Sequence, residues 1–294
     1  MNRKEITEKQ IIRYLVTVFI LAYLVQGVIW RISLTGNPYT TLLMIALMYT
    51  PFLAVILSGI PIKDMGWMPN LKGKVRYLFF ALWLPALLSV LGAVLFFVIF
   101  PHTFDTEFMT LKASIPPEAL AQLEASGMSL VQYALISSIS VLSYAPFINM
   151  FAALGEEIGW RGALYPYLKE RFGKFRGRLI GGVIWGAFHW PLMILTGYEY
   201  GKNYFGAPVL GLVVFCLATI VLGILIDHVY EKTQCIFFPS LMHGAVNANT
   251  LGLMFLRPEY TNMLILGPLY HGLIGVIPMA LLALWISRRS KSAA

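Results

Sequence analysis

The chain has 294 residues, of which 58% are apolar and only 12% are charged. A soluble domain carries roughly a quarter charged residues, and one of this length could not hide so much apolar surface from water. The composition therefore predicts an integral membrane protein and excludes a cytosolic enzyme, a disulfide-stapled secreted module and a disordered chain. In a membrane protein the net charge of +8 reflects topology and does not indicate a nucleic-acid partner.

A spanning helix needs about 20 mostly apolar residues, and eight segments meet this requirement. They predict an all-α, polytopic membrane helix bundle of about eight transmembrane helices, with the lipid bilayer as its surroundings. The segments are 13–34, 39–60, 76–100, 130–155, 178–197, 207–227, 236–256 and 262–286.

Residues 101–129 form the one long connection between these spans. Within it, Pro116 and Pro117 begin the sequence PPEALAQLEASG, and a proline start with a glycine end is typical of a short helix. The segment has few apolar residues, so we expect this helix to lie at the membrane interface.

Basic residues predict the orientation. If both termini are cytoplasmic, 17 of the 22 Lys and Arg residues lie in cytoplasmic segments and 4 on the opposite side, and Arg161 falls within the membrane. This bias follows the positive-inside rule. We therefore expect an integral protein of a cell or endomembrane membrane with both termini in the cytoplasm.

Ionisable groups inside a bilayer are costly and usually mark function. Cys216 and Cys235 lie in or beside apolar runs without ligand spacing, and we interpret them as small buried apolar residues. Asn149 and His271 stand alone and are interpreted as packed core groups. The polar residues that stand out as a set are Glu156, Glu157, Arg161, His189, His243 and Asn247.

Members of this set fall at a similar predicted depth. Glu156 lies 13 residues before the basic segment that begins at position 169, and His189 and His243 each lie 11 residues after a basic residue. At about 1.5 Å rise per residue these separations are ~16–20 Å. We therefore predict that the three side chains line one cavity, nearer the cytoplasmic face.

The segment GEEIGWRG carries two adjacent carboxylates with different neighbours. Glu157 and Arg161 are four residues apart with the acid first, the favoured order for a helical ion pair; a pair that only fixes helix packing is the alternative. Glu156 is about 100° further round the helix, so we expect it to have no local partner and to point freely into the cavity. Glycines occupy positions 155, 159 and 162. They leave one side of this helix without side chains, so a neighbouring helix can approach closely.

Two further pairs share a helix face, Trp185 with His189 in WGAFH and His243 with Asn247 in HGAVN. A carboxylate in an apolar cavity can act as a general base, a histidine can relay the proton, and a second histidine with an amide can donate to an oxyanion. The pattern therefore indicates activation of water. Two imidazoles and a carboxylate are also a known zinc-ligand set, so Glu156, His189 and His243 are the alternative metal ligands.

The motifs EEIGWR (156–161), WGAFH (185–189) and HGAVN (243–247) resemble, in order and spacing, the EExxxR, FxxxH and HxxxN motifs of the CPBP family of intramembrane proteases. This family is also called the type II CAAX-protease or Abi family. The resemblance covers about residues 130–255, and Trp185 stands where the family usually has Phe.

The resemblance implies that Glu156 activates water beside His189, that His243 and Asn247 donate to the oxyanion, and that Glu157 and Arg161, together with Trp185, support them. The remaining expectations follow from it. A mechanism without a cofactor is favoured, with zinc as the alternative. The expected substrate is a membrane-anchored or hydrophobic peptide, with CAAX-type removal of a C-terminal tripeptide from a prenylated protein as the specific expectation. The chain divides into N-terminal transmembrane helices with the interfacial loop (1–129), catalytic helices (130–257), and a C-terminal transmembrane helix with a basic tail (258–294), in one membrane domain.

Two other functions remain as alternatives. A non-catalytic membrane scaffold or bacteriocin-immunity-type protein could keep the fold and use the cavity for binding, although it would not need the complete set of motif residues. A transporter is less well supported, because we find no inverted repeat and no matched pair of Gly/Pro-broken spans.

Overall fold

The computed structural model describes residues 5–35 and 39–291, and within these ranges the chain forms helices and no β-strand. This confirms the predicted all-α class. The α-helices are α1 (Glu8–Ser33), α2 (Thr40–Leu57), α3 (Val75–Ile99), α4 (Met109–Ser114), α5 (Pro117–Ala125), α6 (Leu130–Leu142), α7 (Ala145–Glu157), α8 (Tyr165–Phe172), α9 (Lys174–Phe188), α10 (Trp190–Thr196), α11 (Val209–Thr233), α12 (Phe237–Asn247) and α13 (Ile277–Lys291). A π-helix, η2 (Ile158–Leu164), joins α7 to α8, and 3-10 helices form η1 (Pro101–Thr103), η3 (Leu253–Phe255) and η4 (Pro258–Met263).

Among the described residues, five helical segments are long and apolar enough to cross a membrane, and a sixth is added if the bent pair α5–α6 counts as one span. The five are α1, α2, α3, α9 with α10, and α11. The polytopic membrane bundle is therefore confirmed, but the count of eight spans is not. The short helix predicted after Pro116 is present as α5.

The three other predicted spans are interrupted, each at residues that do not favour a helix. The segment 130–155 breaks at Ser143 and Tyr144, between α6 and α7, and Pro146, which has no backbone N–H to continue a preceding helix, lies in the first turn of α7. The segment 236–256 remains helical only to Asn247, before a run of polar residues. In 262–286 the helix starts at Ile277, after a stretch rich in glycine that contains Pro268.

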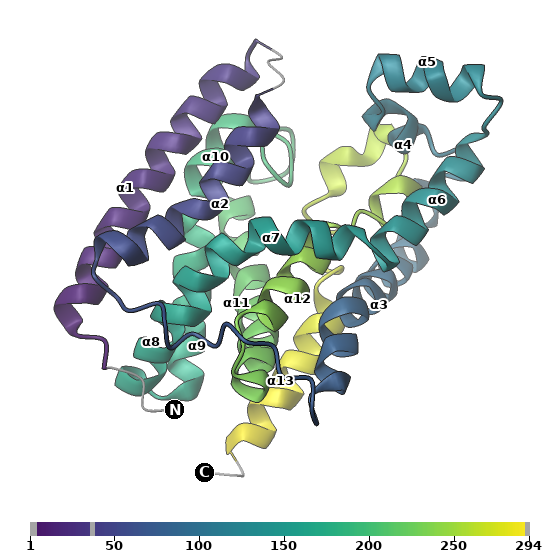
Figure 1. The fold of residues 1–294 in the computed structure, drawn as a ribbon. Helices are drawn as coiled ribbons and strands as arrows, with labels where there is room; N and C mark the ends of the chain where they lie inside the picture. Colours follow the sequence, from purple (N-terminus) through teal and green to yellow (C-terminus); the bar gives the residue numbers. More distant parts are fainter. Residues whose placement is uncertain (1–4, 36–38, 292–294) are drawn as a thin grey trace.

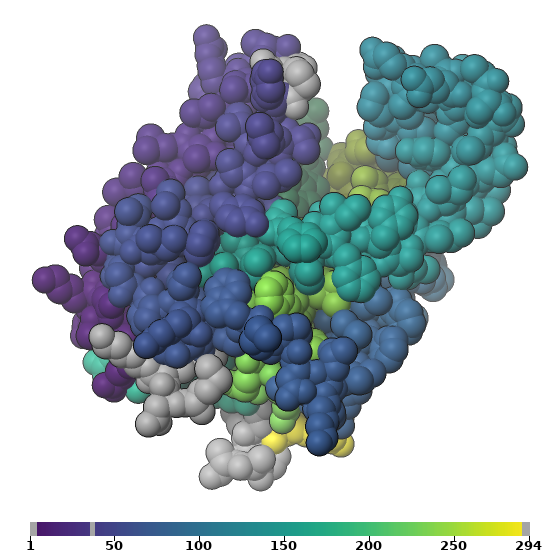
Figure 2. Space-filling view, viewed as in Figure 1, coloured from purple at the N-terminus to yellow at the C-terminus, as the bar shows by residue number. Residues whose placement is uncertain are grey.

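The helices form two arms above a common base (Figure 1). One arm contains α1, α2 and α10, the other contains α4, α5 and α6, and α7 runs across the molecule between them. The space-filling view is hollowed between the two arms, with α7 beneath (Figure 2). α12 packs against α7 and α3, and α11 packs against α9. The start of α1 and the end of α13 lie at the same end of the bundle (Figure 1).

Glycine contacts bring α1 and α2 against the end of α7, as the sequence predicts. A Cβ atom on Gly155 would lie 2.6 Å from the carbonyl oxygen of Met48 in α2. A Cβ atom on Gly159 would lie 2.5 Å from the hydroxyl of Tyr14 in α1. Any larger residue would push these helices apart, so the glycines fix how closely the first two helices surround the polar motif.

An ion-pair cluster ties α8, α9 and α11 together at the end of the bundle that holds both termini. Asp227 bonds to the ammonium of Lys169 at 2.7 Å through Oδ1 and to Nε of Arg178 at 2.6 Å through Oδ2. Glu231 accepts from Arg178 at 3.1 Å and pairs with Lys174 at 2.6 Å. Asp227 and Arg178 are buried, and we refer to these five residues below as the base cluster.

Candidate active site

The EEIGWR motif occupies the end of α7 and the π-helix η2. Glu156, Glu157 and Arg161 are 2%, 0% and 0% exposed, so all three charges are shielded from the surroundings. π-Helical turns are rare and occur frequently at functional sites. The local geometry thus marks the same segment that the motif marks.

Glu157 is shared between a cation and a histidine. Its Oε1 accepts a hydrogen bond from Nη1 of Arg161 at 2.8 Å, so the predicted ion pair is present. The same oxygen lies 2.8 Å from Nδ1 of His243 on α12. Sequence reasoning missed this second contact because it depends on the packing of α12 on α7, where a Cβ on Gly244 would lie 2.5 Å from the backbone nitrogen of Met150. Glu157 therefore orients the ring of His243 as well as pairing with Arg161.

The guanidinium of Arg161 is surrounded by aromatic rings. It lies over the rings of Trp185, at 4.5 Å from the centroid, and Tyr165, at 4.7 Å. Its Nε and Nη2 atoms have no hydrogen-bond partner among the described residues. Cation–π contacts of this kind are strongest when desolvated, and here they compensate in part for the missing hydrogen bonds.

Glu156 is held by two indoles. Its Oε2 accepts hydrogen bonds from Nε1 of Trp160 at 2.9 Å and from Nε1 of Trp185 at 2.8 Å. The expectation that Glu156 has no local partner and points freely into the cavity is therefore wrong. The Trp160 contact could have been predicted from the sequence, since residues four apart share a helix face. The Trp185 contact joins α9 to the motif and gives this residue a polar role that a phenylalanine could not fill.

His189 ends α9, and its ring is fixed by the backbone. Nδ1 lies 3.0 Å from the carbonyl oxygen of Trp185, which can only accept a hydrogen bond. Nδ1 therefore carries the proton, and in the neutral ring Nε2 is left as an acceptor. The ring also stacks parallel to Tyr198, with centroids 6.2 Å apart and an angle of 6°.

The motifs meet at a cavity of about 30 Å³, which is enough room for a water molecule but not for a peptide. Of the three side chains predicted from their depth to line one cavity, His189 and His243 do so, and Asn247 lies beside them. Glu156 does not line it and is connected to it through Trp185. The full lining is Trp185, His189, Tyr198, Glu199, Phe215, Ala218, Thr219, Leu222, His243, Val246, Asn247 and Tyr270.

The described residues do not provide the ligand set of the zinc alternative. No group of three or more His, Cys, Asp or Glu side chains among them could hold a metal ion. Of the three candidate ligands, Glu156 is engaged with the two indoles and His243 with Glu157. We therefore derive no step through zinc.

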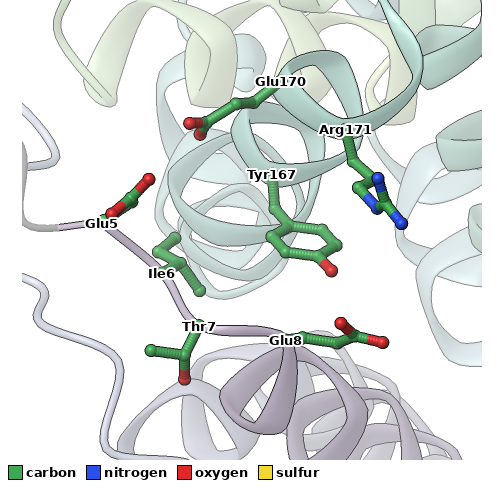
Figure 3. A pocket seen from close by; sticks show the side chains of 7 residues that line it. All are labelled: Glu5, Ile6, Thr7, Glu8, Tyr167, Glu170 and Arg171. Carbon is green, nitrogen blue, oxygen red and sulfur yellow. The ribbon is translucent and has the colours of Figure 1, made fainter.

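A larger surface hollow lies away from the motifs, between the start of α1 and α8 (Figure 3). Its lining includes the acidic side chains of Glu5, Glu8 and Glu170 beside Arg171. None of the motif residues lines it, so size alone does not identify the functional cavity in this molecule.

Several other residues of interest can now be placed. Tyr14 of α1 packs edge-on against Trp160 at 6.2 Å, and no sequence signal distinguishes it from the other residues of its apolar span. Asn149 donates to the carbonyl of Ala145 at 3.0 Å, as a packed polar group would. Cys235 is buried and Cys216 half-buried, and both are free thiols.

His271, in contrast to the expectation that it stands alone, faces a carboxylate. Its Nε2 lies 3.3 Å from Oε2 of Glu199, a residue of the cavity lining. Burial lowers the pKa of His271. The neutral imidazole is therefore favoured at this position.

Sequence comparison agrees with the motifs. Residues 138–249 match the sequence model of the family described as type II CAAX prenyl endopeptidase Rce1-like. A protein named CAAX prenyl protease 2, from Methanococcus maripaludis, is 28% identical over 104 residues, which is 35% of this chain. The match covers 38% of that relative's length.

The matched segment contains all three motifs and the helices α7, α9, α11 and α12 that carry or support them. Residues 138–249 are therefore similar to the CPBP family, the type II CAAX proteases, and the match spans less than half of the chain. The resemblance predicted from the motifs is confirmed at this level.

Proposed function

We propose that the chain is an intramembrane endopeptidase that hydrolyses a peptide bond with water activated by Glu156. The observation that carries this proposal is a buried polar network beside the cavity. Glu156 is bonded to Trp185, which lines the cavity, and Arg161 pairs with Glu157, which contacts His243 on the cavity wall. Two histidines and an amide line this water-sized space and the carboxylate of Glu156 lies behind Trp185; these are the kinds of group that hydrolysis requires.

In this proposal Glu156 is the general base. Both indole hydrogen bonds end on Oε2, so Oε1 is the oxygen that accepts a proton from water. The two indoles hold the carboxylate in one orientation, which keeps Oε1 directed to the same place in each turnover. The water oxygen then attacks the substrate carbonyl carbon, and the C–N bond breaks as the amine takes up a proton.

His189 is suited to carry that proton. Its Nδ1–H is bonded to the backbone, so Nε2 can accept a proton from the Glu156 side and deliver it to the leaving amine. Because the ring is fixed by this bond and by stacking on Tyr198, the relay needs no rearrangement of the histidine.

His243 and Asn247 supply the oxyanion contacts. Glu157 orients the ring of His243 through Nδ1, so Nε2, when it carries a proton, is the nitrogen that donates to the oxyanion. Asn247, one helical turn further on, adds a neutral amide donor. In hydrolases a single donor of this kind contributes about 2.7–4 kcal/mol.

The specific substrate that we propose is a prenylated protein from which a C-terminal tripeptide is removed. The name of the M. maripaludis relative and the Rce1-like domain support it. We further propose a cytoplasmic orientation for both termini. Two observations support that orientation. The start of α1 and the end of α13 lie at the same end of the bundle (Figure 1), and most basic residues fall in the segments predicted to be cytoplasmic.

Peptide release by the full chain in liposomes tests the proposal. Three substrates share one sequence: a prenylated CaaX peptide, its unprenylated form, and a version anchored by an acyl chain. We expect release from both lipid-anchored peptides, faster from the prenylated one, and no effect of a chelator. Inhibition by the chelator that added zinc reverses would contradict the metal-free mechanism. Absence of release from all three by well-folded protein would favour the scaffold alternative.

A further inference from the structure

The cavity wall carries one carboxylate that the proposed mechanism does not use. Glu199 lies in the loop between α10 and α11 and lines the cavity with His189, His243 and Asn247. It is the one acidic residue in the lining, which contains no lysine or arginine. Its side chain is 16% exposed. An isolated carboxylate is expensive to bury, so its position beside the motif histidines needs an explanation.

The backbone at Glu199 is strained. Its φ angle is +71°, a conformation that residues other than glycine rarely adopt. The flanking glycines at 197 and 201 also have positive φ, and the amide of Gly201 bonds to the carbonyl of Gly197 at 2.7 Å. Strained backbone of this kind persists where the surrounding structure enforces it and is concentrated at functional sites. The tight turn presents the Glu199 side chain to the cavity.

A second chain segment, which carries His271, lies against Glu199. His271 is 2% exposed and its Nε2 lies 3.3 Å from Oε2 of Glu199. The hydroxyl of Tyr200 donates to the backbone carbonyl of His271 at 2.6 Å, which fastens the two segments together. Neither ring nitrogen of His271 has a hydrogen-bond partner among the described residues, so His271 flanks the carboxylate without being hydrogen-bonded to it.

From this geometry we propose that Glu199 is a specificity-determining residue: it accepts hydrogen bonds from a basic or amide side chain of the substrate, next to the scissile bond. The inference rests on the endopeptidase function proposed above. A peptide bond that reaches His189 and Asn247 must bring its neighbouring residues against the same wall. There the carboxylate attracts a lysine, arginine or glutamine side chain and repels an acidic one, and the low-dielectric surroundings strengthen both effects.

The test is a set of lipid-anchored peptides that differ only at the residues flanking the cleaved bond, with Lys, Gln, Leu or Glu at each position. For the wild-type chain we expect kcat/KM to favour Lys over Glu by at least ~10-fold at one flanking position. A small difference in the electrostatic free energy of the two peptides beside Glu199 is enough to produce a tenfold ratio. Glu199→Gln should reduce this ratio to within about twofold of unity, chiefly by raising KM for the Lys peptide, with kcat for the Leu peptide little changed.

Two variants serve as controls. Glu259→Gln removes an exposed carboxylate outside the cavity and should keep the full preference for Lys. Asparagine tolerates positive φ better than most other residues do, so Glu199→Asn repeats the test if Glu199→Gln proves unstable. Equal cleavage of all four peptides by the wild type, or an unchanged Lys/Glu ratio in the folded Glu199 variants, would overturn this inference and leave the endopeptidase proposal standing. Cleavage of none of the peptides would instead contradict the endopeptidase proposal.

Discussion

The base cluster and the motif network are both sets of buried charges that join helices, and they differ in how well the charges are compensated. In the base cluster, Asp227 uses both carboxylate oxygens, one for Lys169 and one for Arg178. In the motif network, Oε2 of Glu157 and two nitrogens of Arg161 have no hydrogen-bond partner among the described residues.

The compensating groups also differ in kind. The base cluster contains only lysine, arginine and carboxylates, which hold their charges near neutral pH. The motif network adds imidazoles and indoles, and it borders a cavity. Fully paired charges are suited to fixing three helices together. Incompletely paired charges next to a titratable ring are suited to moving protons.

The largest expected effect is the loss of stability when the base cluster is broken. Arg178→Ala leaves Asp227 buried with one cation in place of two, and removing one partner of a buried ion pair typically costs about 3–5 kcal/mol. Thermal unfolding in detergent should show a large decrease in Tm. Arg171→Ala, which removes an exposed arginine on α8, is the matched control. A Tm for Arg178→Ala equal to that of the control would show that the cluster contributes no stability.

Arg161→Ala should be destabilising by a smaller amount, about 3 kcal/mol at the lower end of the range for a buried pair. The reason is that Nδ1 of His243 still lies 2.8 Å from Oε1 of Glu157 and leaves this carboxylate one hydrogen-bond partner. Thermal unfolding in detergent beside Arg178→Ala is the measurement. A decrease in Tm as large as that of Arg178→Ala would mean that His243 does not compensate for the loss of Arg161.

Trp185→Phe should have the smallest effect on stability and a measurable effect on rate. The change restores the usual family residue and removes one indole donor from Glu156. A hydrogen bond to a charged group contributes about 1.5–3 kcal/mol, so we expect kcat to fall roughly 10- to 100-fold. Trp83→Phe also removes an indole donor, from a bond to the carbonyl of Leu142, and should leave kcat unchanged. Equal rates for the two variants would show that the indole bond plays no part in orienting Glu156.

The sequence predicted the helical class, the short helix after Pro116 and the meeting of His189 with His243 at the cavity. These predictions succeeded because composition, proline and glycine signals and residue spacing act locally or along one helix. The Glu157–Arg161 pair, for example, needs only a four-residue separation. The position of the short helix at the membrane interface stays a prediction. The glycines also predicted that a neighbour approaches the motif helix closely, but they did not identify α1 and α2 as these neighbours.

The contacts between distant segments could not be predicted in the same way. The bonds from Glu157 to His243 and from Trp185 to Glu156 depend on the register of α12 and α9 against α7, which no single helix specifies. Glu199 was overlooked because it lies in a loop, and its partner His271 is more than 70 positions away. Hydropathy also could not settle the number of spans, since residues 262–276 are apolar and mostly buried or half-buried without forming one continuous helix.

The central claim is that the incompletely paired network is catalytic and the fully paired one is structural. Glu156→Gln tests it most directly, because glutamine keeps the shape of the side chain and cannot act as a base. The account predicts that peptide release falls by about 10²–10⁴-fold while Tm stays close to that of the control Glu170→Gln, which changes an exposed glutamate on α8. A folded Glu156→Gln protein that releases peptide at the control rate would contradict the account.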